Sequence, residues 1–326
     1  MSILAVLEHN GKSWGRTTWE TVAAVQQMAR ELNTTASAAV VRTGGQALAD
    51  EAAHKQFERV YLVDHELLND YTPDGYSIAL KQLIAQVKPD VVLFGHTYQV
   101  RDFLPKLATA LNTVAVTDVV SHRVEGSELV LVRQLFQGKV NVDVRFSSPA
   151  PHLASLQAGS YRADQAVDGS SAVEVVKPQL SAADLRTKPL ELFRESQRAV
   201  DLGAAEIIVS VGRGIKESDN IELVKKLADA LGAELAASRP ICDAGWLPME
   251  RQVGSSGQTV APKMYMAVGI SGAIQHLVGM KASKTVIAIN KDENAPIFEV
   301  ADYGVVGDLF EVVPALTAAV KKVKQT

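Results

Sequence analysis

The sequence of 326 residues contains a single cysteine, Cys242, and only 6% aromatic residues. A single cysteine excludes an internal disulfide and a cluster of thiolate metal ligands, and it fits a reducing, cytoplasmic compartment. The scarcity of aromatic side chains argues against a surface on which nucleic-acid bases stack. An excess of positive charge is also lacking, because 33 Lys and Arg stand against 37 Asp and Glu. This balance argues against nucleic acid as a partner, since proteins that bind it normally carry a basic face.

Long apolar runs and targeting signals are missing as well. No run of 18 apolar residues occurs, so we expect no transmembrane segment. The first ten residues lack the basic start and the small-residue cleavage site of a secretion signal. What the sequence does have is 47% hydrophobic residues, enough to bury large cores, over a length typical of roughly two domains.

Short apolar runs alternate with stretches of helical periodicity over the first 111 residues. Strands are expected at 2–8, 36–41, 59–63 and 90–94, and helices at 20–32, 77–87 and 102–111. Such alternation predicts an α/β fold with a Rossmann-like, mostly parallel sheet that helices cover. Period-two patterns at 122–132 and 140–146 indicate antiparallel strands that complete the same sheet.

Residues 163–188 are rich in Ser, Ala, Pro and Asp and lack lasting periodicity, so this stretch is interpreted as a linker. The boundary is therefore placed near residue 190, between an N-terminal α/β domain, 1–190, and a C-terminal α/β domain, 191–326. In the second domain, strands are expected at 206–211, 265–269 and 285–289, and helices at 220–231, 271–280 and 308–324. Pro314 is expected to kink or interrupt the last helix.

Two glycine-containing segments follow expected strands of the second domain. In Gly212-Arg213-Gly214, the glycines would let a phosphate approach the backbone and the guanidinium would make forked contacts, although a tight turn with a solvated arginine explains the same pattern. In residues 269–276, Ser271 is expected to open a helix whose free N–H groups favour an anion such as a pyrophosphate. His276 lies near enough to contact the same ligand, but read alone it is more often a partly buried histidine.

Further polar groups come from loops. Residues 252–259 hold several hydroxyls and amides that suit donation to heteroatoms, although most stretches of this kind are surface turns. Ser238 and Arg239, which follow the apolar run 234–237, supply a hydroxyl and a guanidinium, and Asn290 closes a strand. Asp308 is expected to be the N-cap of the last helix, a role that requires no ligand.

Several signatures of catalysis are absent. The sequence has no three-glycine dinucleotide fingerprint, no P-loop and no G-x-S-x-G elbow, and its seven histidines show no metal-ligand spacing with carboxylates. Neither a catalytic residue nor a metal ligand is therefore assigned. Phosphate- and ring-binding elements without an acid–base pair indicate a site that holds a cofactor rather than one that hydrolyses a substrate.

The stretch from Gln252 to Val313 closely resembles the α subunit of electron transfer flavoproteins. The motifs that carry the resemblance are VGISGAIQH (268–276), AINKD (288–292), ADYGVVGDL (301–309), GRG (212–214), SRP (238–240) and DAGW (243–246). These motifs are specific and span residues 205–315, whereas the first 190 residues fit the family's N-terminal α/β domain mainly in pattern.

The resemblance implies one FAD, held mainly by the C-terminal domain at its junction with the β subunit of a heterodimer. The positions that match the family's FAD contacts are Arg213, Ser238, Arg239, Val253, Gly254, Ser255, Ser256, Ser271, Gly272, Ala273, Ile274, Gln275, His276, Asn290, Asp308 and Leu309. It further implies that Arg239 and His276 lie beside the isoalloxazine, His276 near its O2 edge, and that the Ser256 hydroxyl lies near N5. Many relatives have Thr at that last position, so the hydroxyl is expected to be less restricted here.

A carrier of this family takes electrons from flavin dehydrogenases, such as acyl-CoA dehydrogenase in fatty acid β-oxidation, and delivers them to a quinone oxidoreductase or another acceptor. Cationic and dipolar groups beside the ring would favour a flavin semiquinone. Two alternatives stay open. The chain could be the α subunit of an NADH-dependent electron-bifurcating flavoprotein, or a nucleotide-binding interaction module without redox use.

Overall fold

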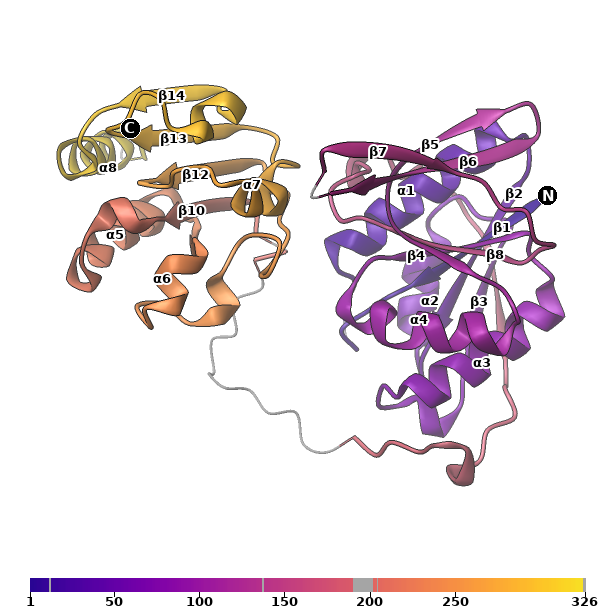
Figure 1. Cartoon of the computed structure of the whole chain (residues 1–326). Coiled ribbons are helices and arrows are strands. Elements are labelled where there is room, and N and C mark those ends of the chain that lie inside the picture. The colour runs from indigo at the N-terminus through magenta and orange to yellow at the C-terminus, as the bar shows by residue number, and fades with distance from the viewer. Residues whose placement is uncertain (12, 137, 190–201, 204, 325–326) are drawn as a thin grey trace. The chain divides into compact units, whose positions relative to one another are not determined.

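The computed structural model describes residues 1–324 except for residues 12, 137, 190–201 and 204. The chain forms two compact units, Met1–Leu192 and Phe193–Thr326 (Figure 1). Each unit is a sheet with helices packed on it, so the expected α/β class is confirmed. The expected boundary at residue 190 lies outside the described residues.

Unit 1 is built on a nine-stranded sheet with the order β7-β6-β5-β8-β4-β1-β2-β3-β9. Its strands are β1 (Ser2–Leu7), β2 (Thr35–Val41), β3 (Arg59–Val63), β4 (Val91–Gly95), β5 (Ala115–Glu125), β6 (Glu128–Leu135), β7 (Val140–Val144), β8 (His152–Leu156) and β9 (Ala172–Val176). The neighbours in the run β5-β8-β4-β1-β2-β3-β9 pair parallel. Strand β6 pairs antiparallel with both β5 and β7. The antiparallel strands therefore complete the same sheet, as the sequence predicts.

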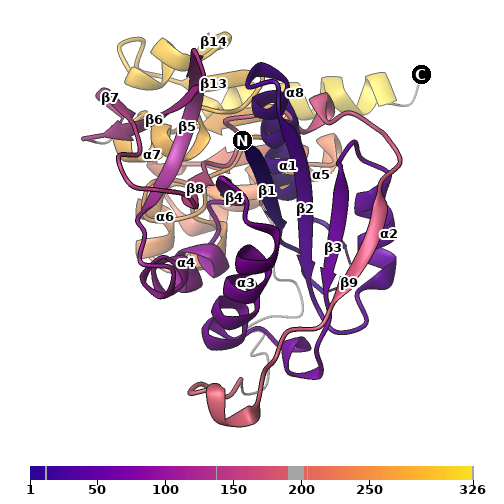
Figure 2. The ribbon, with the colours of Figure 1, turned by 90° about the vertical axis from the view of Figure 1, so that its right-hand side faces the viewer.

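Helices cover both faces of this sheet (Figure 2). They are α1 (Arg16–Glu31), α2 (Gln46–Ala53), α3 (Pro73–Val87) and α4 (Tyr98–Ala110). In β1, Ile3 and Ala5 belong to the core that α1 and α2 close, whereas Leu4 and Val6 belong to the core under α3 and α4. Because successive side chains of a strand point to opposite faces, a strand buried on both sides is the apolar run seen in the sequence.

The linker expected at 163–188 is wrong for much of its length. Strand β9 lies inside it and pairs with β3 at the edge of the sheet. The chain then stays docked on unit 1, because the backbone N–H of Arg186 donates to Asp74 at 2.9 Å and that of Gln179 donates to Gln82 at 2.8 Å. As an edge strand, β9 leaves Ala172 and Val175 exposed and is less buried than the central strands.

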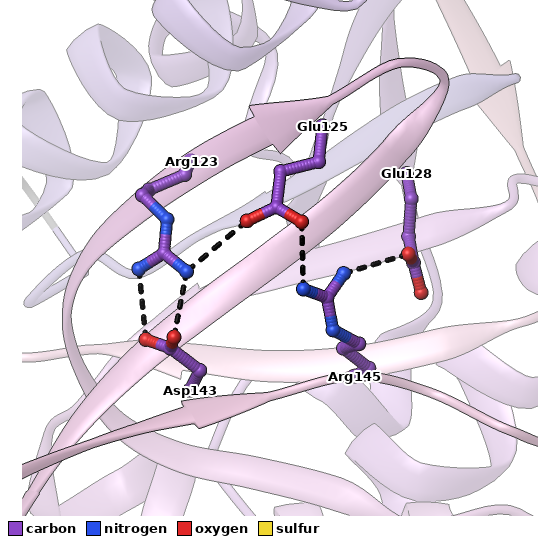
Figure 3. Close-up of polar contacts among 5 residues, drawn as sticks. All are labelled: Arg123, Glu125, Glu128, Asp143 and Arg145. Carbon is purple, nitrogen blue, oxygen red and sulfur yellow. Dashed lines mark hydrogen bonds and ion pairs between the residues drawn. The ribbon is translucent and has the colours of Figure 1, made fainter.

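A network of ion pairs covers one face of the antiparallel strands (Figure 3). Arg123 holds Asp143 through two bonds of 2.8 and 2.6 Å and also donates to Glu125 at 3.2 Å. Arg145 donates to Glu125 and to Glu128, each at 2.7 Å. Val130, the register partner of Arg123, is fully buried. The charged side chains therefore lie on the same face of these strands as the buried Val130.

Unit 2 has a five-stranded parallel sheet with the order β11-β10-β12-β13-β14. The strands are β10 (Ile207–Val211), β11 (Glu234–Ala237), β12 (Met264–Val268), β13 (Val286–Asn290) and β14 (Tyr303–Val306), and the helices are α5 (Ile221–Leu231), α6 (Arg239–Asp243), α7 (Ile274–Met280) and α8 (Leu309–Lys324). Helices α5 and α8 close one core, and residues around α7 close the other.

Two helices of unit 2 differ from the expectation. Helix α7 begins at Ile274 rather than at residue 271, because Gly272 has a φ of +86° and Ala273 has a ψ of 142°, which is not helical. Helix α8 runs through Pro314 without interruption. Among the described residues, no helix is long and apolar enough to cross a bilayer.

Candidate functional site

A cavity of about 630 Å³ opens at the carboxyl ends of the strands of unit 2. Its walls come from the segments that follow β10, β11, β12 and β13. Strand β10 lies between β11 and β12, so the chain order reverses beside it. Ligands of open α/β sheets bind at such a reversal, and the volume is in the range of small-molecule sites. Topology and size therefore both mark this cavity as the candidate site.

Most positions assigned from the sequence line this cavity. They are Arg213, Ser238, Arg239, Val253, Gly254, Ser255, Ser256, Ser271, Ala273, Gln275, His276 and Asn290. Residues that the sequence left unassigned also line it, namely Gly214, Pro240, Asp243, Gln252, Gly269, Ile270, Asp292, Ala295 and Pro296. Several of these belong to the motifs quoted above, so their place in a motif was the signal that could have found them.

Four assigned residues are not among those that line the cavity. Asp308 accepts a hydrogen bond from the backbone N–H of Phe310 at 2.9 Å and so caps α8, as predicted. Leu309 is buried in the core beneath the sheet. Gly272 packs against Ile297, whose backbone nitrogen would lie 2.2 Å from an added Cβ. Ile274 is partly exposed on the first turn of α7.

The glycines of Gly212-Arg213-Gly214 serve backbone packing. A Cβ at Gly212 would stand 2.4 Å from the carbonyl oxygen of Gly269, and one at Gly214 would stand 2.7 Å from its Cα. The backbone N–H of Gly214 donates to the same carbonyl at 3.0 Å. These contacts join the ends of β10 and β12 and give the two glycines a structural role, while the expected approach of a phosphate to this segment stays a prediction. Arg213, between them, is exposed and lines the cavity.

A buried amide orders the polar loop after α6. Gln252 is 1% exposed, and its Nε2 donates to Oγ of Ser256 at 3.0 Å. The backbone N–H of Ser255 donates to the carbonyl of Gln275 at 2.7 Å, which ties the loop to α7. Because Oγ of Ser256 accepts a hydrogen bond from the Gln252 amide, the Ser256 hydroxyl can still donate its hydrogen to a ligand. The Gln252 amide thus restrains the Ser256 hydroxyl, although Ser256 lacks the β-methyl group that a threonine would have at this position.

The cationic groups at the cavity are on its surface. Arg239 begins α6, its side chain is 65% exposed, and its Nε lies 3.2 Å from a carboxylate oxygen of Asp243. Such an exposed pair is weak, so the guanidinium remains free to move toward a ligand. Asp243 and Asp292 also line the cavity, and their negative charge partly offsets that of Arg213 and Arg239.

His276 is held differently from the arginines. It is 6% exposed, and its Nε2 lies 2.9 Å from the hydroxyl of Tyr265. Burial lowers its pKa from 6.5 to about 4, against a smaller raising effect of the Val253 carbonyl. The imidazole is therefore neutral at neutral pH, and the positive charge at the cavity comes from the arginines rather than from His276.

Comparison with known proteins agrees with this site. Residues 3–183 match the model of the electron transfer flavoprotein domain, and residues 201–281 match that of the electron transfer flavoprotein FAD-binding domain. The chain belongs to the electron transfer flavoprotein family. It is 42% identical over 271 residues to electron transfer flavoprotein subunit alpha of Thermoanaerobacterium thermosaccharolyticum, with 81% of each chain covered.

Two further relatives show the breadth of the family. The subunit alpha of Bacillus subtilis is 41% identical over 277 residues and covers 85% of each chain. The acryloyl-CoA reductase electron transfer subunit beta of Anaerotignum propionicum is 38% identical over 307 residues, covering 85% of this chain and 84% of its own. Membership of this electron transfer flavoprotein family and the FAD-binding domain match identify FAD as the cofactor.

The chemistry of the cavity fits that cofactor. FAD carries heteroatoms and a pyrophosphate along an extended molecule, and the cavity offers serine hydroxyls, amides and two guanidinium groups. Gln252 Oε1 is buried and has no hydrogen-bond partner among the described residues. This orphaned acceptor belongs to a residue that lines the cavity, so the site has a polar atom that its own chain does not satisfy.

Proposed function

We propose that this chain is the FAD-holding α subunit of a two-subunit electron carrier. The observation that carries the proposal is the cavity at the carboxyl ends of β10 to β13, most of whose lining residues belong to the segment 201–281 that matches the FAD-binding domain. Its one imidazole is neutral and hydrogen-bonded, so it is poorly suited to general acid–base catalysis at neutral pH. A site with donors but without an acid–base pair suits a cofactor that exchanges electrons and breaks no substrate bond.

The residues assigned to the site have different roles in binding FAD. Bound FAD supplies the electron-accepting ring system. We propose that Arg213 and Arg239 lie against its electron-rich or anionic parts, and that the loop with Ser255 and Ser256 donates hydrogen bonds to its heteroatoms. Asn290 acts by bracing, because its Nδ2 donates to the carbonyl of Ile270 at 2.9 Å.

We propose an electron transfer flavoprotein β subunit as the second chain of a heterodimer. The electron donors would be flavin dehydrogenases, such as an acyl-CoA dehydrogenase, and the acceptor a quinone oxidoreductase. Relatives named subunit alpha, and one named as an electron transfer subunit of an acryloyl-CoA reductase, support this assignment. Cys242 is buried with a pKa raised to about 11, so a reactive thiol is not part of the proposal. We also propose that the heterodimer is located in the cytoplasm.

Co-purification with the β subunit tests the proposal and separates its alternatives. One FAD together with one AMP per heterodimer supports the plain carrier. Two FAD per heterodimer, with NADH as reductant, supports an electron-bifurcating complex. A colourless heterodimer, or a flavin bound wholly by the β subunit, contradicts the proposal and favours an interaction module.

A further inference from the structure

The chain that connects the two units stays bonded to unit 1 after β9 ends. Residues 177–186, here called the strap, leave β9 and run past helix α3 (Figure 2). Near the start of the strap, the backbone N–H of Gln179 donates to Oε1 of Gln82 at 2.8 Å, and Nε2 of Gln82 donates to the Gln179 carbonyl at 2.8 Å. Because a backbone N–H only donates and a carbonyl only accepts, this pair fixes the orientation of the Gln82 amide.

The other end of the strap is held by a buried carboxylate that the flavin site does not use. Asp74 lies in the first turn of α3 and is 3% exposed. One of its oxygens accepts the backbone N–H of Arg186 at 2.9 Å, and the other forms an ion pair with Lys106 of α4. Burial of a carboxylate is costly unless its oxygens are paired. Release of Arg186 would leave one Asp74 oxygen without this partner, so the strap is held here by more than a surface contact.

Apolar contacts and an internal turn join the two ends of the strap. Leu180 packs against the core that α3 and α4 close. Leu185 lies over the start of α3, where its Cδ2 would be 3.5 Å from a Cβ at Gly75. Between these leucines, Ser181 and Asp184 cap a single 3-10 turn through reciprocal hydrogen bonds. The strap is therefore a folded part of unit 1 that contacts α3 at both of its ends.

Docking of the strap determines how much chain is left to connect the units. With the strap docked, the connection begins at Arg186 and ends at Ile207, where β10 begins. Residues 187–206 would span about 70 Å at full extension. With the strap released, the connection would begin at the end of β9, and residues 177–206 would span about 100 Å. The maximum separation of the two attachment points is thus shorter when the strap is docked.

We propose that the strap is a conformational device that limits how far the flavin-binding unit can lie from unit 1. Asp74 is its anchor, and Gln82 is its second point of attachment. The inference goes beyond the proposed function, because the strap contributes nothing to the flavin cavity and its docking requires no flavin. For a carrier that exchanges electrons with more than one protein, this limit restricts the positions from which the flavin can be approached.

Two variants release the strap without changing the core of unit 1. Arg186→Pro removes the N–H that Asp74 accepts and leaves the ion pair with Lys106 in place. Leu185 has a φ of −92° and a ψ of 108°, so the residue before the new proline is already extended, as proline requires.

Gln82→Leu removes both bonds at the other end of the strap. Gln86→Leu is the matched control, because Gln86 is exposed on the same helix and its side chain has no hydrogen bond among the described residues. Hydrogen exchange of the heterodimer measures docking. In the wild type, amides of the strap should exchange at least tenfold more slowly than in an unstructured peptide of the same sequence. Each releasing variant should speed this exchange at least tenfold and leave β1 unchanged, and the control should match the wild type.

The reach of unit 2 is measured by the distance between two spin labels. The labels are attached at Glu51→Cys on α2 and Glu222→Cys on α5, both exposed positions, with the cysteines of the β subunit replaced. Cys242 is buried, so labelling is confined to the introduced cysteines. When Gln82→Leu and Arg186→Pro are combined, the distance distribution should extend to longer distances than in the wild type and in the control.

Two results would overturn the inference. The first is a wild-type strap that exchanges as fast as the unstructured peptide, a measurement that needs no variant to fold. The second is an unchanged distance distribution in the double variant although its strap has lost protection. If the double variant also lost protection in β1, Gln82→Leu alone would carry the test. A heterodimer without flavin would contradict the proposed function, and both measurements could still be made on it.

Discussion

Gly254 lies so close to Gln275 that a Cβ atom at Gly254 would stand 2.8 Å from the Gln275 carbonyl oxygen. That oxygen also accepts the backbone N–H of Ser255 at 2.7 Å, so it cannot move away without breaking the bond that ties the cavity loop to α7. The φ of Gly254 is +145°, a conformation that side chains rarely adopt. Position 254 therefore requires glycine on two independent grounds.

Gly254→Ala is expected to destabilise unit 2 by about 1–3 kcal/mol and to weaken FAD binding at least tenfold, through strain at this contact. Urea unfolding followed by flavin absorbance measures both effects. Gly15→Ala is the control, because Gly15 has a φ of −84° and nothing within 4 Å of its Cβ position. Equal losses in the two variants would contradict the contact as the cause.

Arg239 and Asp243 should move the one-electron potential of the flavin in opposite directions. Arg239→Ala removes a cation from the cavity and should lower the potential by several tens of millivolts, where about 59 mV corresponds to about 1.4 kcal/mol. Asp243→Asn removes the carboxylate that pairs with it at 3.2 Å and should raise the potential. Redox titration measures both, with Arg162→Ala of unit 1 as the control. Arg239→Ala with an unchanged potential would disprove the electrostatic role.

The hydroxyl of Ser256 can be tested by removing and by restraining it. Ser256→Ala should lower the flavin potential, because a hydrogen-bond donor to the electron-rich ring is lost. Ser256→Thr should leave the potential near that of the wild type, because Gln252 already fixes the hydroxyl at 3.0 Å. The same titration compares them. A shift in Ser256→Thr as large as that in Ser256→Ala would show that the amide does not restrain the hydroxyl.

The elements that the sequence predicts are those with strong local patterns. Central strands such as β1 and β12 are buried on both faces, and their apolar runs identify them. Strands β9 and β14 lie at sheet edges with exposed side chains, and the sequence pattern missed both. Helix α2, which is only eight residues long, was missed for lack of enough turns to show a period. Strand β8, which lies between β5 and β4 and is mostly buried, was missed as well, so edge position and length explain only part of what the sequence did not predict.

The residues of the site, like the elements of the fold, were only partly predicted. The resemblance to the family assigned most of the residues that line the cavity. It did not assign Gln252, whose amide donates to Ser256, or Tyr265, whose hydroxyl lies 2.9 Å from Nε2 of His276. Hydrogen bonds between elements depend on packing, which no single-chain pattern contains. The close packing of Gly212 and Gly214 against Gly269 could not be predicted for the same reason.

Because of His276, the free energy of unfolding of unit 2 should decrease as the pH is lowered. Its pKa is about 4 in the folded chain and near 6.5 when unfolded, so between these values the unfolded state binds more protons. This stability is fully present above pH 6.5 and is lost progressively as the pH falls toward 4. His276→Gln keeps a polar side chain that does not titrate there, so its stability should change less between pH 7 and pH 5 than that of the wild type.

Hydrogen exchange of the β12 amides measures the stability of unit 2 separately from that of unit 1. The half-buried histidines whose pKa values are also lowered, His9, His96 and His122, belong to unit 1 and do not report on β12. Equal pH dependence of β12 exchange in the variant and the wild type would mean that His276 takes up a proton as readily in the fold as outside it.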